Sequence, residues 1–134
     1  MSRSRNFLFA MAAVIFVPFL LVLLPGATPG LPQLSAATSA ITAEDAASHD
    51  GSLVTVEGVA REVHVARSGR AIFIDLDGTY PDQPFAAVIF EDDMAKVGDV
   101  GDLQGRTVDI TGTIRMYKGR PEIVVHSRSQ IAAR

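Results

Sequence analysis

The chain has 134 residues, no cysteine and a formal net charge of −3. Its first third differs in composition from the rest, so the length supplies one domain of fewer than about 100 residues. Such a small core has no disulfide or cysteine-bound metal to support it, which favours a closed, well-packed architecture. From Ile41 on, 10 Lys and Arg stand against 15 Asp and Glu, a net charge of −5, which argues against a general nucleic-acid coat.

Residues 1–24 have the pattern of an export segment. Arg3 and Arg5 precede Phe7 to Leu24, a stretch of 18 residues without a charge. We expect a hydrophobic helix that is either a signal peptide, cleaved among the small residues 35–40, or an uncleaved membrane anchor. In both cases the arginines hold the N-terminus in the cytoplasm, so the domain lies outside it, periplasmic or secreted.

Residues 25–40 are rich in Pro, Gly, Ala, Ser and Thr, a composition typical of a linker or a cleavage region. The folded domain is therefore expected at residues 41–134. At its start, Thr42 stands three residues before Asp45, and Gly51 follows. This spacing predicts a short helix that closes one end of a barrel.

From Leu53 the hydrophobic pattern changes to a period of two, which is typical of strands. The alternation shifts by one position at Gly58, which predicts a bulge there in a long first strand that serves both halves of a closed sheet. Further strands are expected at 71–76, 85–90, 107–116 and 122–126, a short helix at 91–97, and a tail at 127–134. Five strands with a helix between the third and fourth predict an all-β OB (oligonucleotide/oligosaccharide-binding) barrel.

Four segments also carry a family resemblance: residues 54–59, 80–85, 105–114 and 117–123. They resemble the OB-fold nucleic acid-binding domains of small exported bacterial proteins, which are also attached to some secreted nucleases. The resemblance covers nearly all of 41–131 and implies a module that binds single-stranded nucleic acid. Most shared positions are core, bulge and turn residues, so the resemblance is specific for fold and says little about activity.

In OB barrels, ligands cross the face of strands two and three, bordered by the loops that join strands one to two and four to five. These regions hold five of the domain's ten basic residues. The candidate cations are Arg67, Arg70, Arg115, Lys118 and Arg120, four of which (all but Arg115) we assign to phosphates, with Tyr117 and Phe73 as stacking platforms. The alternative is that these loops simply collect soluble turn residues.

The strand at 71–76 allows two phases. Phe73 faces the groove if Ile72, Ile74 and Leu76 face the core, whereas the opposite phase puts Phe73 in the core. Asp75 and Asp77 share the face of Phe73, where their charge would repel phosphate. They could hold a divalent cation or sugar hydroxyls, but two aspartates at this spacing are more often solvated strand and turn residues.

Catalytic motifs are sparse. His49, His64 and His126 are scattered along the sequence, so we expect neither a zinc site nor a cofactor. The acidic residues 91–93 fit a helix N-terminus better than a metal cluster. The OB haem chaperone of cytochrome c maturation has a tyrosine four positions after its histidine, where Gln130 follows His126 here, so that function is rejected.

The sequence therefore predicts a non-catalytic exported module that binds single-stranded nucleic acid or another extended anionic ligand. The rival hypothesis is a module that binds a protein or a glycan of the cell envelope. A nuclease is a third hypothesis and requires metal-dependent cleavage. The membrane is an expected partner if the N-terminal segment is not cleaved.

Overall fold

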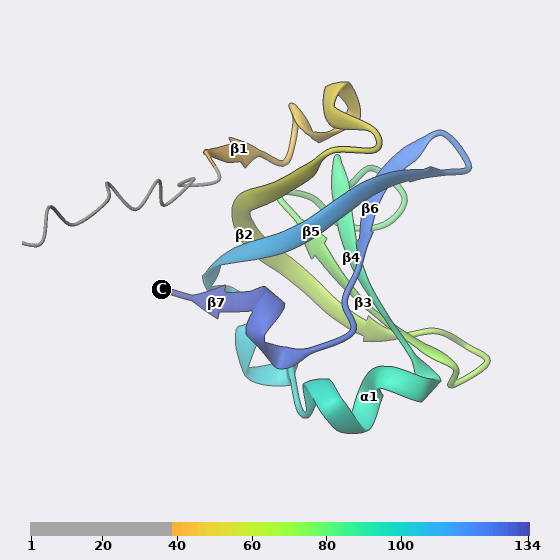
Figure 1. The fold of residues 1–134 in the computed structure, drawn as a ribbon. Coiled ribbons are helices and arrows are strands. Elements are labelled where there is room, and N and C mark those ends of the chain that lie inside the picture. Colours follow the sequence, from red (N-terminus) through yellow and green to blue (C-terminus); the bar gives the residue numbers. More distant parts are fainter. Residues whose placement is uncertain (1–38) are drawn as a thin grey trace, which may run out of the picture. The chain divides into compact units, whose positions relative to one another are not determined.

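The computed structural model describes residues 39–134 (Figure 1). The expected hydrophobic helix and nearly all of the expected linker lie outside the described residues. The strands are β1 (Ala40–Thr42), β2 (Leu53–Val65), β3 (Ala71–Leu76), β4 (Phe85–Phe90), β5 (Thr107–Tyr117), β6 (Arg120–Val124) and β7 (Ile131–Ala133). The helices are α1 (Glu91–Val97) and the short 3-10 turns η1 (Ala46–His49), η2 (Gly101–Leu103) and η3 (Arg128–Gln130).

Five strands close into a barrel in the order β2, β3, β4, β6, β5, and β2 pairs again with β5. All of these pairings are antiparallel except β4 with β6, which is parallel. The helix α1 lies between β4 and β5 in the chain and beneath one end of the barrel (Figure 1). This order and pairing are those of an OB barrel, so the all-β five-stranded expectation is confirmed.

The long strand β2 takes part in both halves of the closed sheet, as predicted. Its first half, Leu53–Val59, pairs with β5, and its second half pairs with β3. The predicted bulge at Gly58 is wrong, because Gly58 pairs regularly with Val108 and the register shifts between Ala60 and Glu62. The shift turns Val63 toward the core and Glu62 and His64 to the outer face, because one extra residue reverses the alternation.

Gly58 is needed instead because the end of β3 passes close to its backbone. A Cβ atom at this position would lie 2.8 Å from Oδ2 of Asp77 and 3.1 Å from the Cβ of Leu76. Asp77 has a left-handed backbone (φ 57°), and its Oδ1 accepts a hydrogen bond from the Val59 amide at 2.8 Å. Asp77 is therefore a turn residue that fixes the edge of β2, which agrees with the turn interpretation of its sequence.

The core is aliphatic and lies inside the barrel. Its largest fully buried side chains come from every barrel strand and include Val56, Ile74, Phe85, Ile110 and Ile123. Burying a side chain of this size stabilises the fold by about 1.5–3 kcal/mol relative to exposing it. Because these residues alternate with outer-face residues along each strand, the core also fixes which side chains reach the outer surface.

The segment that leads into β2 forms a strand and a 3-10 turn where a helix was expected. Thr42 belongs to β1, and its Oγ1 accepts a hydrogen bond from the Asp45 amide at 3.2 Å. Ala43 and Ala46 are fully buried against the barrel. The predicted cap at Thr42 is wrong, because η1 begins after Asp45 and has no side-chain cap. The segment still covers the barrel through its buried alanines, and its single turn is usual for 3-10 geometry.

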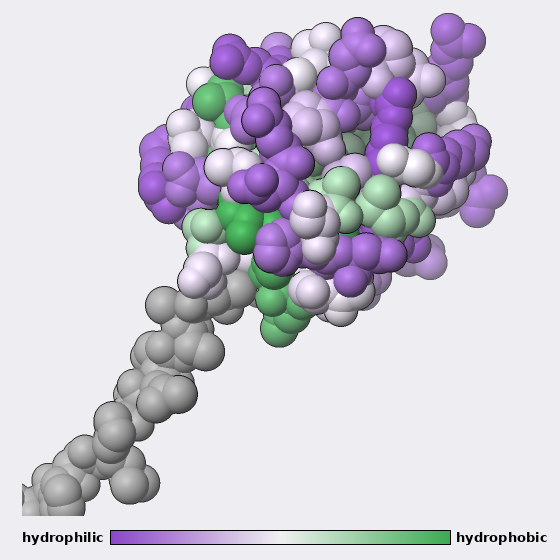
Figure 2. All heavy atoms as spheres, turned by 90° about the horizontal axis from the view of Figure 1, so that it is seen from above, coloured by the Kyte–Doolittle hydropathy of each residue, from purple (hydrophilic) through white to green (hydrophobic). Residues whose placement is uncertain are grey.

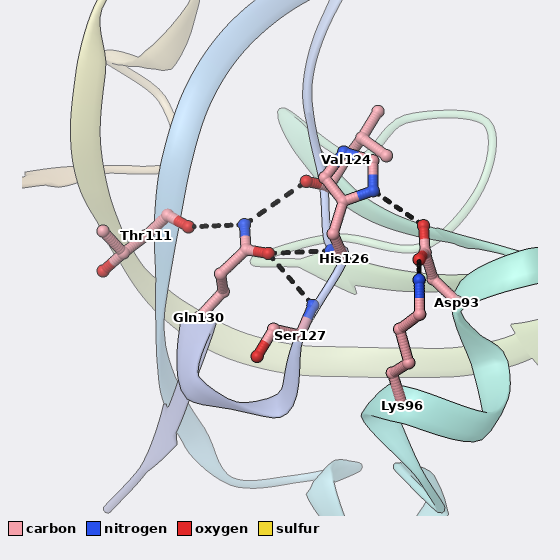
Figure 3. Close-up of polar contacts among 7 residues, drawn as sticks. All are labelled: Asp93, Lys96, Thr111, Val124, His126, Ser127 and Gln130. Carbon is pink, nitrogen blue, oxygen red and sulfur yellow. Dashed lines mark hydrogen bonds and ion pairs between the residues drawn. The ribbon is translucent and has the colours of Figure 1, made fainter.

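The last eight residues are part of the fold, so the expected tail is wrong. Ser127 caps η3 in a capping box with Gln130, and β7 pairs with β5. The Gln130 side chain accepts hydrogen bonds from the amides of His126 (2.7 Å) and Ser127 (3.1 Å) and donates to the carbonyls of Thr111 (3.0 Å) and Val124 (3.3 Å) (Figure 3). The Ser-x-x-Gln spacing is the sequence signal for this cap.

Hydrophilic residues cover most of the face shown in Figure 2, where hydrophobic residues reach the surface only in small patches. Such scattered apolar exposure is normal for a folded domain and indicates no large apolar contact surface on that face. None of the helices within residues 39–134 is long and apolar enough to cross a membrane.

Candidate ligand-binding groove

A groove of about 580 Å³ lies on the outer face of the barrel. Its lining comes from the end of β2, from β3, from the loop between β3 and β4, from the start of β4 and from the hairpin that joins β5 to β6. The β5–β6 hairpin projects above and the β2–β3 hairpin below on the same side of the barrel (Figure 1). The groove therefore occupies the position where OB barrels hold their ligands.

The β5–β6 hairpin presents its side chains through a two-residue turn. Lys118 (φ 51°) and Gly119 (φ 77°) both have left-handed backbones, and Tyr117 pairs with Arg120 across the turn. This geometry matches the twist of the two strands, and glycine is the residue that adopts it most easily. The Lys118 ammonium lies 5.3 Å from the ring centre of Tyr117, so a cation and an aromatic face stand together at the rim.

Three of the predicted cations line the groove: Arg67, Lys118 and Arg120. Arg120 donates a hydrogen bond to the amide oxygen of Gln83 at 3.3 Å and lies 5.8 Å from the ring centre of Tyr80. Within residues 39–134, none of the three forms an ion pair with a carboxylate. Their charges thus remain available to an anion in the groove.

The structure does not bring the other two predicted cations into the groove lining. Arg70 lies in the β2–β3 hairpin but pairs with Glu91 at the start of α1, at 3.0 Å between Nε and Oε2. Arg115 pairs across the sheet with Glu122, at 2.7 Å between Nε and Oε1, and lies 5.6 Å from the ring centre of Phe90. Both guanidiniums already have carboxylate partners. The two-residue turn at Lys118 and Gly119 sets the register that places Arg115 opposite Glu122, whereas nothing in the sequence indicates the pairing of Arg70 with Glu91.

Besides the buried Phe85, three aromatic side chains line the groove. The phase of β3 that places Phe73 outward is confirmed, because Ile74 and Leu76 are fully buried in the core. Tyr117 is 54% exposed, as a stacking platform requires. Tyr80, which is 69% exposed, is a third aromatic in the lining that sequence reasoning missed.

The floor of the groove is acidic. Asp75 is fully buried, so the expectation that it is solvated is wrong. Burial raises the pKa of Asp75 to about 6, an effect that nearby Glu62 increases and His64 opposes. The His64 ring stacks on Phe73 with ring centres 5.3 Å apart and planes at 20°. His64 therefore belongs to this floor and is held in place by Phe73.

Sequence reasoning also missed three polar lining residues, His64, Gln83 and Glu122. His64 could have been found if the strand shift had been placed after Ala60, because the shift decides which face it occupies. Tyr80 and Gln83 lie in the loop that joins the two strands of the ligand-binding face. A search that included this loop, besides the two that border OB grooves, would have found both.

The fold and the groove define an OB-fold domain with a ligand-sized outer groove. No family model matches the chain, and no curated protein sequence matches it. Among solved structures, aspartyl-tRNA synthetase from Entamoeba histolytica matches with 18% identity and a TM-score of 0.49, over 78% of this chain and 23% of that one. Asparaginyl-tRNA synthetase from the same organism matches with 23% identity and a TM-score of 0.46, over 73% and 23%. This chain spans less than a quarter of either synthetase, and similarity at this level does not bear on its ligand.

Proposed function

We propose that this domain is a non-catalytic binding module whose groove takes single-stranded nucleic acid or another extended anionic ligand without reading its sequence. One observation carries the proposal. The end of β2 with β3, the loop between β3 and β4, and the β5–β6 hairpin bring three cations and, besides the buried Phe85, three aromatic rings to the one groove. Sequence-tolerant binding of a single strand needs both, because cations follow the phosphates and aromatic rings stack on bases.

The cations supply the electrostatic part of binding. Arg67 comes from the hairpin between β2 and β3, and Lys118 and Arg120 come from the hairpin between β5 and β6. A strand in the groove would therefore meet positive charge from two separate hairpins. The net charge of −5 on residues 41–134 opposes long-range attraction of polyanions, so we expect weak binding that depends strongly on salt.

The aromatic rings supply the stacking part. Each base that stacks on such a ring contributes about 1–3 kcal/mol, and this contribution is similar for all bases. Tyr80 and Tyr117 are both more than half exposed, and a cation lies beside each ring. A cation over an aromatic face favours a neighbouring phosphate and base together, which suits a nucleotide better than an inorganic anion.

A glycan or a protein of the cell envelope is the second candidate ligand. The groove lining includes the buried carboxylate of Asp75, which has no hydrogen-bond donor, and the acceptor oxygens of Glu122 and Gln83, which already accept from Arg115 and Arg120. Hydroxyl donors of a sugar satisfy such acceptors, and sugar rings pack on exposed aromatic faces. Binding of a neutral glycan would change little with salt, which separates this candidate from the first.

We also propose that the N-terminal segment exports the domain from the cytoplasm, as either a cleaved signal or an anchor. The proposal rests on Arg3, Arg5 and the uncharged stretch from Phe7 to Leu24. Fusion of the chain to a reporter enzyme that is active only outside the cytoplasm tests it, and N-terminal sequencing of the exported product distinguishes the two forms. A fusion that stays inactive overturns the proposal.

The binding proposal is tested by fluorescence anisotropy with a labelled single-stranded oligonucleotide at low salt, in the presence of a chelator. Tyr117→Ala should weaken binding by about 5- to 100-fold, which corresponds to the loss of one stacked base. Lys118→Asn combined with Arg120→Gln should weaken it further, and asparagine tolerates the left-handed turn. Absence of binding by the unchanged protein at low salt would overturn the nucleic-acid proposal.

Arg70→Gln is the matched control, because Arg70 is an exposed cation near the same groove that pairs with Glu91 outside it. The control should bind as the unchanged protein does. Incubation of the oligonucleotide with the protein and a divalent cation, followed by gel electrophoresis, tests the non-catalytic part. Metal-dependent cleavage that is lost in a groove variant would contradict it.

A further inference from the structure

A carboxylate without a partner lies at the floor of the groove. The Asp75 side chain has no exposed surface, and neither of its oxygens has a hydrogen bond of normal length and angle within the described residues. A buried carboxylate is almost always paired, hydrogen-bonded or bound to a cation, because its charge is otherwise stripped of solvation.

Two further ligand groups lie beside Asp75. The strand register places Glu62 directly opposite Asp75, and His64 follows two residues later on the same face of β2. One donor atom from each of the three residues lies within 4.8 Å of the other two. The β2 bulge creates this arrangement, because without the register shift Glu62 and His64 would point into the barrel.

The distance between Nδ1 of His64 and Oδ2 of Asp75 is 3.6 Å, and both atoms lack a hydrogen bond. Two ligands of one tetrahedral ion, each bound at about 2.0 Å, stand about 3.3 Å apart. The observed separation is thus close to that of two atoms that share a metal. Stacking on Phe73 holds the imidazole plane in place, which is the kind of support that metal-binding histidines need.

We propose that Glu62, His64 and Asp75 bind a Zn²⁺ ion at the floor of the groove. One imidazole and two carboxylates match the ligands that zinc accepts, whereas Mg²⁺ and Ca²⁺ prefer oxygen ligands throughout. Three protein ligands leave a fourth tetrahedral position, which water can fill. The site is independent of nucleic-acid binding, which is measured in the presence of a chelator.

The test is a titration of the full-length chain with Zn²⁺ against a chromophoric chelator, in mild detergent because of the 18-residue uncharged stretch. The unchanged protein should bind one equivalent. Asp75→Asn and His64→Gln should each weaken binding by at least about 100-fold, since even changes outside the ligand shell cost 10- to 100-fold. Co²⁺ should give the intense visible bands of a tetrahedral site in the unchanged protein and not in the variants.

Asp93→Asn is the matched control, because Asp93 also contacts a histidine, His126, but lies away from the groove. It should leave zinc affinity unchanged. If Asp75→Asn alters the fold, as judged by its circular dichroism, His64→Gln decides the result, because His64 is partly exposed. Failure of the unchanged protein to bind one equivalent, or unchanged affinity in His64→Gln, would overturn the proposal and leave the proposed function standing.

Discussion

Two aspartates of this domain each lie beside a histidine, and their surroundings are opposite. Asp93, on α1, accepts a hydrogen bond from Lys96 at 2.9 Å and contacts Nδ1 of His126 at 2.6 Å (Figure 3). These hydrogen bonds, the Lys96 bond first, hold the pKa of Asp93 below its usual range. Asp75, at the groove floor, has no such bond, and burial raises its pKa to about 6.

The difference in hydrogen bonding indicates that Asp93 belongs to a structural contact and Asp75 to a candidate binding site. At the end of the barrel that α1 covers, each polar group of the cluster around Asp93 and His126 has partners, and the cluster joins the helix to the C-terminal segment. At the groove of about 580 Å³, the side chains of Asp75 and His64 have buried polar atoms without a hydrogen bond, and Arg67, Lys118 and Arg120 have no carboxylate partner within the described residues. Unsatisfied polar groups in a concave region are typical of places where a protein meets its ligand.

The largest expected effect concerns the hydrogen-bonded cluster around Asp93 and His126, which Gln130 supports. Gln130→Ala removes four hydrogen bonds and leaves two amides and two carbonyls without their partner. We expect the free energy of unfolding, measured with urea, to fall by about 2 kcal/mol. Ser129→Ala, next to it and exposed, should change it by less than about 0.5 kcal/mol. Equal effects of the two changes would remove the contrast between the two regions.

A smaller effect of opposite sign is expected at the groove floor. In the presence of a chelator and at neutral pH, Asp75→Asn should raise the free energy of unfolding by about 1 kcal/mol, because it removes a charge that burial disfavours, as the pKa of about 6 indicates. The same urea titration measures it, with Asp77→Asn as a comparison at the turn. A clear loss of stability in Asp75→Asn would mean that the carboxylate makes a stabilising contact.

The smallest expected effect is the pH dependence of the Asp93 cluster. Its pKa is lower in the folded chain than in the unfolded chain, so its stabilisation is complete above the unfolded pKa of about 3.9. The stabilisation is lost as the pH falls through the folded value. Asp93→Asn should flatten the acid limb of stability measured against pH, and Asp92→Asn, an exposed neighbour, should not. Parallel curves for all three proteins would contradict the role of the cluster.

Much of the fold could be predicted because local patterns determine it. The predicted strands at 71–76 and 85–90 coincide with β3 and β4, since both are short apolar runs bounded by turn residues. The bulge was predicted at Gly58, but the structure has it between Ala60 and Glu62. Glycine marks several kinds of backbone constraint, and here the constraint is contact with Asp77.

The site was predicted less completely, for a physical reason. Alternation shows which residues share a face, so Phe73 was expected in the groove only for one of two phases of its strand. Alternation does not show how deeply a residue is buried or which residue pairs with it. Asp75 was expected in solvent, but it is fully buried. Arg70 and Arg115 were predicted to bind the ligand, but each has a carboxylate partner. Glu91, the partner of Arg70, comes from α1, so only tertiary structure reveals it, whereas the pairing of Arg115 with Glu122 follows from the register of the β5–β6 hairpin.

The most direct test of the binding proposal is the salt dependence of oligonucleotide affinity. For single strands, the slope of log K against log salt concentration is negative, and its magnitude decreases by about 0.7 for each phosphate contact that is lost. Arg120→Gln should reduce the slope by about this amount, whereas Arg70→Gln, whose guanidinium pairs with Glu91, should leave it unchanged. Equal slopes for the unchanged protein and Arg120→Gln would contradict the assignment of this groove to a nucleic-acid strand.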